Sequence, residues 1–296
     1  MKKFFIASIF VMLLILPLTA IGDTQLLNNN TTKEQNIRNE DFTHTVFAEY
    51  GTMTTCPYCV AASSQLYSIY NSGDLDFDYV SLVWDEANVR VRNRLKEIGI
   101  TNVPDVYFDG KFKNILGRQN DETPYRNAIN QCGVRDVEDI DISVQVDWKG
   151  GGTLKITVTV INNEAEKYNG HLRTYVVEKE SRWNDNSGNP YHYAAIDIPI
   201  DKGLSLSKEM PRFAGETYTF SKTWFGAIHG FSDIDIDNIV VIATVFDSDT
   251  DYAVESAMGQ PTISNPNDRQ VTNFLASFIF ERLINKFLIL QDLLLK

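Results

Sequence analysis

Two cysteines three positions apart, in the tetrapeptide Cys56-Pro57-Tyr58-Cys59, are the residues of this chain best suited to chemistry. An apolar run, 45–50, precedes them, and a run without proline or glycine follows, so the pair lies where a predicted strand leads into a helix. At this spacing both thiols share one helix face, and a thiolate at Cys56 would meet the unpaired N–H groups of the first turn, which lowers its pKa. The pattern indicates a dithiol for disulfide exchange, with Cys56 as the nucleophile and Cys59 as the shielded resolving thiol.

A metal site and a structural disulfide are the two other uses of such a pair. Zinc is held by about four ligands, whereas this sequence offers one cysteine pair and four histidines without ligand spacing, His44, His171, His192 and His229. A structural disulfide across so short a loop would restrain the unfolded chain little. The junction of strand and helix therefore favours redox chemistry, and we expect neither a metal nor a cofactor.

Alternating strand and helix patterns surround the motif. The predicted strands are 45–50, 77–84, 105–109 and 111–116, and the predicted helices are 56–71, 86–98 and 123–132. Asp109-Gly110 between two apolar runs predicts a hairpin, which makes the last two strands antiparallel. These elements predict an α/β domain over residues 43–133.

This order of elements around Cys-Pro-Tyr-Cys resembles the thioredoxin superfamily. The later run Val103-Pro104, followed by Phe-Asp-Gly, makes the domain most similar to glutaredoxins. The resemblance implies that Pro104 is a cis-proline that opens a strand and faces the dithiol, and that Pro57, Tyr58 and Val103 help to bind substrate. It also implies a thiol–disulfide oxidoreductase whose partners are protein thiols and disulfides and a redox partner of unknown identity.

Glu49 is an unexpected carboxylate in an otherwise apolar strand. Burying a carboxylate without a partner is costly, so a functional reason is attractive. In thioredoxins a buried acid at the end of this strand relays protons to the resolving cysteine, and Glu49 resembles it, although it stands one position further from the motif than in typical thioredoxins. The alternative is a carboxylate at the strand end that reaches water.

Residues 1–22 have the pattern of a signal peptide. Lys2 and Lys3 precede an uncharged apolar stretch, 4–18, and small residues follow it. The stretch is short for a membrane span, so we expect cleavage, with an uncleaved anchor as the alternative. Either outcome places the dithiol outside the cytoplasm, secreted or in the cell envelope, where disulfides persist. Residues 23–42 lack apolar periodicity and predict a polar linker.

From residue 134 the pattern changes to alternating strands. They are predicted at 140–148, 153–160, 172–179, 217–223, 239–246 and 252–257, with no helix between them. Such strands predict an antiparallel, immunoglobulin-like β-sandwich over 134–262. A thioredoxin domain followed by a sandwich resembles the organisation of Omp28-related envelope proteins. The alternative function is therefore an envelope binding protein that acts through its sandwich and whose redox domain is auxiliary.

The net charge of −12 argues against a nucleic-acid partner. Most of it lies in 134–270, where 22 acidic residues face 12 basic ones, a net charge of −10. The acidic run 247–251 begins like a calcium-binding EF-hand loop, but Tyr252 and Met258 stand where that loop needs a glycine and a bidentate carboxylate. We interpret this run as an acidic hairpin turn.

Cys132, the third cysteine, ends the predicted helix 123–132. A lone cysteine is usually an inert buried side chain, and a regulatory or intermolecular disulfide is the alternative. The tripeptide Tyr191-His192-Tyr193 could line a groove, although aromatic residues in a sandwich are more often part of the core.

Residues 271–296 predict an amphipathic helix with a broad apolar face. Its interior charges, Glu281, Arg282 and Lys286, argue against a transmembrane span. Because an uncovered apolar face is a liability in water, we expect this helix to lie against the protein, a partner, or, peripherally, a membrane surface.

Overall fold

A computed structural model describes residues 42–206 and 216–263 of the chain. The predicted signal peptide 1–22, nearly all of the linker and the predicted helix 271–296 lie outside the described residues. In the part of the chain that is described, no helix has the length and apolar character needed to span a membrane.

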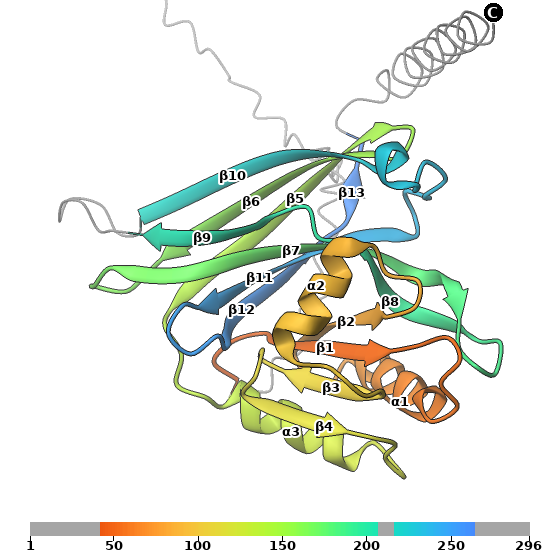
Figure 1. The fold of residues 1–296 in the computed structure, drawn as a ribbon. Helices are drawn as coiled ribbons and strands as arrows, with labels where there is room; N and C mark the ends of the chain where they lie inside the picture. Colours follow the sequence, from red (N-terminus) through yellow and green to blue (C-terminus); the bar gives the residue numbers. More distant parts are fainter. Residues whose placement is uncertain (1–41, 207–215, 264–296) are drawn as a thin grey trace, which may run out of the picture. The chain divides into compact units, whose positions relative to one another are not determined.

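The first seven elements alternate as predicted and form a thioredoxin-like domain (Figure 1). They are β1 (Val46–Thr52), α1 (Cys59–Ser72), β2 (Phe77–Val83), α2 (Val89–Ile98), β3 (Asp105–Phe108), β4 (Lys113–Leu116) and α3 (Thr123–Gly133). Both α1 and α2 begin three residues later than predicted. For α2 the reason is Asn88, whose side chain accepts hydrogen bonds from the N–H groups of Arg90 and Val91 and so caps the helix there.

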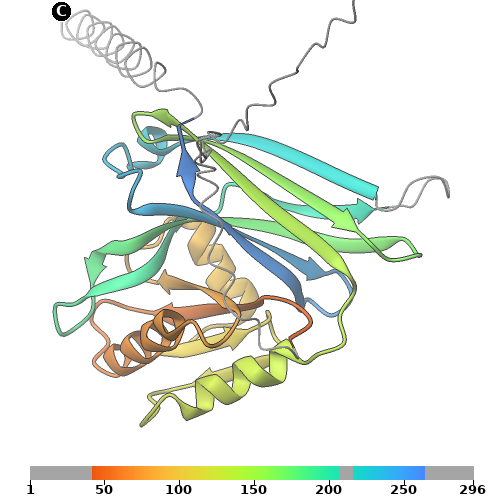
Figure 2. The same ribbon diagram turned by 180° about the vertical axis from the view of Figure 1, so that it is seen from behind.

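The strands of this domain are ordered β2-β1-β3-β4. β1 and β2 are parallel, whereas β3 is antiparallel to both β1 and β4. The prediction of an antiparallel hairpin is confirmed, because β3 and β4 pair antiparallel with Phe108 opposite Lys113. The connection comprises residues 109–112, so it is longer than the two residues predicted, and Asp109 and Gly110 at its start have positive φ angles of 46° and 64°. Helices α1 and α3 cover one face of the sheet and α2 covers the other, as the two views show (Figures 1 and 2).

The remaining described residues form a strand-rich region. Its elements are β5 (Ile140–Gly150), β6 (Thr153–Asn162), β7 (Tyr168–Asn184), β8 (Pro190–Asp197), β9 (Asp201–Leu206), β10 (Glu216–Phe225), the 3₁₀-helix η1 (Gly226–His229), β11 (Ile239–Asp247), β12 (Ala253–Gly259) and β13 (Pro261–Thr262). All six predicted strands are present, and β8, β9 and β13 are additional. β8 begins at a proline and is buried along most of its length, so it lacks the alternation that marks a half-exposed strand.

The strand-rich region contributes to two sheets. One has the order β10-β6-β5-β13, and the other runs β12-β11-β7-β8-β2-β1-β3-β4, so it continues into the thioredoxin-like domain. The two sheets share an apolar core that includes Ile156 and Val158 of β6 and Val176 of β7. Two sheets that pack on a common apolar core are compatible with a β-sandwich. The immunoglobulin-like topology stays a prediction.

β8 joins the two parts of the long sheet. It lies parallel to β2, with Ser81 opposite Ala194, and the Ser81 hydroxyl donates to the carbonyl oxygen of His192 at 2.8 Å. All seven residues of β2 are buried, as expected for a central strand of a sheet that is covered on both faces. The sequence predicts separate domains over 43–133 and 134–262, whereas in the structure one sheet passes through both.

A second apolar core lies on the α2 face and is built from both parts of the chain. Phe47 of β1 packs there with Tyr175 of β7, their ring centroids 5.3 Å apart, and with Phe246 of β11, at 6.2 Å. Burial of this apolar surface stabilises the association of the strand-rich region with the thioredoxin-like domain.

Candidate redox site

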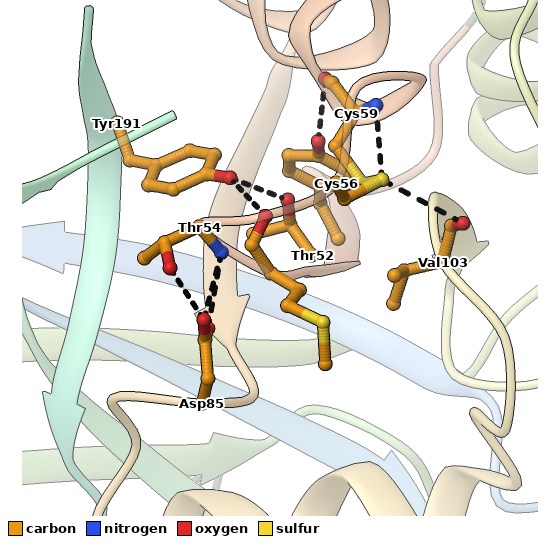
Figure 3. Close-up of a disulfide and its surroundings, with 9 residues drawn as sticks. Thr52, Thr54, Cys56, Cys59, Asp85, Val103 and Tyr191 are labelled. Atoms are coloured by element: carbon orange, nitrogen blue, oxygen red, sulfur yellow. Dashed lines mark hydrogen bonds between the residues drawn. A yellow bond between two sulfur atoms is a disulfide. The ribbon is translucent and has the colours of Figure 1, made fainter. Parts of the chain in front are cut away.

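Cys56 and Cys59 form a disulfide at the start of α1, with an S–S distance of 2.15 Å and Cα atoms 5.4 Å apart (Figure 3). Cys59 is the first residue of α1 and is fully buried, whereas Cys56 lies just before the helix and is 7% exposed. Cys56 is thus the less buried of the two cysteines, and the assignment of Cys56 as nucleophile and Cys59 as resolving thiol stays a prediction.

The start of α1 provides the electrostatic environment that the sequence predicts for Cys56. The backbone N–H of Cys59 donates to Cys56 Sγ at 3.1 Å. Within the described residues, no side chain caps this end of α1 and its first turn carries no acidic residue. The unpaired N–H groups and the positive end of the helix dipole therefore remain available to stabilise a Cys56 thiolate.

Val103 and Pro104 lie opposite the disulfide. Their peptide bond is cis, as the resemblance implies, and Pro104 directly precedes β3. The carbonyl oxygen of Val103 lies 3.8 Å from Cys56 Sγ. Pro57 and Tyr58 are exposed beside the disulfide, Tyr58 with 60% of its surface accessible. The four predicted substrate-binding positions are thus brought together around Cys56.

The loop that leads to Cys56 is held by two side chains that sequence analysis does not assign to the site. Asp85, after β2, accepts hydrogen bonds from the N–H of Thr54, at 3.0 Å, and from its hydroxyl, at 2.5 Å. The Tyr191 hydroxyl of β8 donates to the carbonyl oxygen of Met53 at 2.9 Å. The sequence suggests that Tyr191 could line a groove or belong to the core, but nothing in its local sequence indicates that it contacts this loop.

Glu49 is not brought to the dithiol. Alternate residues of a strand face opposite sides of the sheet, and the neighbouring Tyr50 faces the disulfide, its hydroxyl donating to the carbonyl oxygen of Cys59 at 2.8 Å. Glu49 therefore faces α2, on the other side. There its two carboxylate oxygens accept hydrogen bonds from Arg94, at 2.8 and 2.7 Å. A proton relay to Cys59, and equally a strand-end carboxylate in water, do not fit this position.

The Glu49–Arg94 pair is buried and further satisfied by hydrogen bonds. Arg94 is 2% exposed, and Tyr175 of β7 donates to Glu49 at 2.6 Å. Arg94 also pairs with Glu97, which in turn pairs with Arg173 of β7. The carboxylate that sequence analysis associates with catalysis thus belongs to an ionic network that joins the thioredoxin-like domain to the strand-rich region.

Cys132 is fully buried near the end of α3, and burial raises the pKa of its thiol well above the ordinary value. Because a protonated, inaccessible thiol is unreactive, we expect iodoacetamide to leave Cys132 unmodified in the folded protein at pH 8 and to modify it in denaturant. Mass spectrometry of the modified peptides checks this result. Rapid modification of the folded protein would instead favour the regulatory disulfide.

The acidic run 247–251 forms the turn between β11 and β12. The Asp247 carboxylate accepts hydrogen bonds from the backbone N–H groups of Asp249 and Thr250, at 3.2 and 2.8 Å. This is the local bonding of an aspartate at a turn, in agreement with the interpretation of the run as an acidic hairpin turn.

Comparison with known proteins identifies the first domain. Residues 45–113 match the glutaredoxin family, and this part of the chain is a glutaredoxin domain of the thioredoxin superfamily. A search of curated proteins found no match. The family match supports a thiol–disulfide redox role in general terms.

Among solved structures, HBP35 of Porphyromonas gingivalis is similar over 76% of this chain and 79% of that chain, with a TM-score of 0.53 and 12% identity. A protein of Agrobacterium tumefaciens covers 75% of this chain with a TM-score of 0.43 and 10% identity, over 96% of its own length. A β-glucuronidase of Bacteroides uniformis covers 40%, with a TM-score of 0.23 and 20% identity, over 12% of its length. The similarity to HBP35 indicates a shared fold that extends beyond the glutaredoxin domain.

Proposed function

We propose that the protein is an extracytoplasmic thiol–disulfide oxidoreductase that exchanges dithiols and disulfides with protein substrates through Cys56 and Cys59. The observation that carries the proposal is the Cys56–Cys59 pair itself, placed at the uncapped start of α1 in a glutaredoxin domain and facing the Val103 carbonyl. The predicted signal peptide supports the location, because disulfide chemistry persists outside the cytoplasm.

The reduction of a substrate disulfide has two balanced steps. The Cys56 thiolate attacks one sulfur of the substrate disulfide, which forms a mixed disulfide and releases the other substrate sulfur as a thiolate. Cys59, as a thiolate, then attacks Cys56 Sγ, which releases the second substrate thiolate and forms the Cys56–Cys59 disulfide. Substrate oxidation is the same sequence in reverse, and in either direction an external dithiol or disulfide partner restores the starting state.

Each neighbour of the disulfide has a defined part in this reaction. The N–H of Cys59 stabilises negative charge on Cys56 Sγ, both in the thiolate and when Cys56 is the leaving group. The exposed Pro57 and Tyr58, together with Val103 and Pro104, form the surface against which an extended substrate segment would lie. The Val103 carbonyl, close to Sγ, can accept a hydrogen bond from that segment.

A difference in thiol pKa tests the proposal. In the reduced protein we expect Cys56 to titrate well below the free-thiol value of about 8.5, because of the helix terminus, and Cys59 not to. The rate of alkylation of each cysteine between pH 4 and 10 measures this difference, and turnover of insulin disulfides provides the activity. Equal reactivity of both thiols near pH 8.5, without turnover, would exclude the proposed role.

The second candidate function is binding by the strand-rich region. One observation favours it: a hollow of about 450 Å³ in that region is lined mainly by acidic side chains, among them Glu138, Glu166 and Asp247. In this case the protein would bind a ligand equally well with both cysteines replaced by serine. Loss of disulfide exchange in the same variant, with ligand binding retained, would show that the two activities are separate.

A further inference from the structure

β8 of the strand-rich region reaches the redox site. Tyr191 is fully buried in the apolar cluster that contains Cys56 and Cys59. Its hydroxyl accepts a hydrogen bond from the hydroxyl of Thr52 at 3.0 Å and donates to the carbonyl oxygen of Met53 at 2.9 Å, as Figure 3 shows for Tyr191 and Thr52. A residue far from the dithiol in sequence therefore holds the end of β1 and the start of the loop that carries Cys56.

The Met53 carbonyl connects Tyr191 to the nucleophile. The same oxygen accepts the backbone N–H of Cys56 at 3.1 Å. This turn sets the position of Cys56, whose Sγ then lies 3.1 Å from the N–H of Cys59. The chain of contacts runs from the Tyr191 hydroxyl to the Met53 carbonyl, to the Cys56 backbone, and so to the sulfur at the helix terminus.

Tyr191 is itself anchored by its neighbours in β8. His192 stacks on Tyr67 of α1, with ring centroids 3.4 Å apart and planes 5° apart. Tyr193 has a φ of 54°, an unfavourable conformation for a non-glycine residue, and packs on Tyr70 and Tyr79. Backbone strain of this kind persists where surrounding contacts enforce it, and it occurs often at functional sites. Three consecutive residues of β8 thus contact the segments on either side of Cys56 in the sequence. Tyr191 bonds to the loop before it, and His192 and Tyr193 pack on the helix α1 after it.

We propose that Tyr191 is a positioning residue for Cys56, through which the strand-rich region helps to set the reactivity of the dithiol. The inference rests on the proposed exchange reaction. Under this proposal the strand-rich region is part of the redox site, because the hydroxyl that bonds to the Met53–Cys56 turn comes from β8.

The size of the effect follows from the loss of one hydrogen bond. A net contribution of 0.5–1.5 kcal/mol corresponds to a factor of about two to ten in an equilibrium constant. Removing the Tyr191 hydroxyl loosens the turn, so Cys56 Sγ is held less firmly at the helix terminus and its thiolate is stabilised less. Since stabilisation of the reduced form makes a dithiol more oxidising, the thiol–disulfide equilibrium should move toward the disulfide.

The test compares Tyr191→Phe with Tyr125→Phe in the full chain. Tyr125 lies in the same apolar cluster and its hydroxyl has no hydrogen-bond partner among the described residues, so the control makes the same chemical change without breaking a bond. For Tyr191→Phe we expect a higher Cys56 pKa, alkylation about two to ten times slower at pH 6, and a comparable shift toward disulfide in equilibrium with glutathione. Tyr125→Phe should leave all three unchanged.

Two further measurements keep the result unambiguous. Thr52→Val leaves the bond to Met53 in place, so it should change the Cys56 pKa less than Tyr191→Phe does. In the unaltered protein, the Cys56 amide should exchange slowly with solvent. Equal effects of Tyr191→Phe and Tyr125→Phe, equal effects of Tyr191→Phe and Thr52→Val, or rapid exchange of that amide would overturn the inference. These readouts need no substrate, so an absence of turnover would count against the proposed function and not against the role of Tyr191.

Discussion

Replacing Cys56 with serine is expected to reduce disulfide exchange to the rate of the uncatalysed reaction. The hydroxyl of serine is not a nucleophile toward disulfides at neutral pH, so the first step of the proposed reaction cannot take place. Reduction of insulin disulfides and oxidative refolding of a reduced protein measure the two directions. Cys132→Ser is the matched control, since Cys132 is fully buried, takes no part in the disulfide and should not contribute to turnover.

Cys59→Ser should give a different result, because only the second step is lost. The Cys56 thiolate still attacks the substrate, but the mixed disulfide has no internal thiol to resolve it. Substrates should accumulate as covalent adducts that a reducing agent releases, visible by mass spectrometry under non-reducing conditions. Turnover that survives in Cys56→Ser, or adducts that form through Cys132, would place the chemistry elsewhere in the chain.

Glu49→Gln is expected to destabilise the protein strongly. The substitution leaves the Arg94 guanidinium charged, 2% exposed and without its bidentate partner. Breaking a buried ion pair in this way costs about 3–5 kcal/mol, which for a protein of this size lowers Tm by roughly 6–20 °C. Thermal unfolding followed by circular dichroism measures the change.

Glu122→Gln is the matched control for Glu49. Glu122 pairs with Arg126 at 2.9 Å, but both side chains are about 30% exposed, and exposed pairs contribute about 0.2–1 kcal/mol. Its Tm should therefore change by only a few degrees at most. If Glu49→Gln kept the Tm and instead altered the pH dependence of exchange, the proton relay suggested by the sequence would be correct and the structural role wrong.

The sequence is informative where chemistry and local structure coincide. The cysteine spacing, the strand before it and the helix after it lie within thirty residues, so propensity and periodicity indicate them together. The hairpin after β3 is also indicated locally, since an Asp-Gly pair favours the positive φ angles found there. The hydrogen bonds that the buried Asp109 carboxylate accepts from Phe47 and Arg135 are not visible in that local pattern. These features predict the thioredoxin-like domain and place the cysteine pair correctly at the junction of β1 and α1, although only Cys59 lies within the helix.

The features that sequence analysis misses depend on contacts between distant residues. The Glu49 carboxylate accepts a hydrogen bond from Tyr175, which lies 126 positions away in the sequence. A carboxylate in an apolar strand indicates that a partner is needed, but it does not indicate which residue is the partner. Tyr191 reaches Met53 across 138 positions. β8 is buried by both parts of the chain, so its apolar sequence carries no alternation from which its position beside β2 could be read.

The place of β8 beside β2 imposes an order on folding. During synthesis, β2 is made long before its neighbour Pro190–Asp197, and until then the edge of β2 that pairs with β8 at Ser81 has no neighbouring strand. Uncovered strand edges promote association between chains. The nascent glutaredoxin domain can therefore associate with other chains through the uncovered edge of β2. The edge stays uncovered for some time, because contacts of such long sequence separation form slowly. Chains released before residue 197 should accumulate as aggregates, whereas chains completed through β8 close the edge within their own fold.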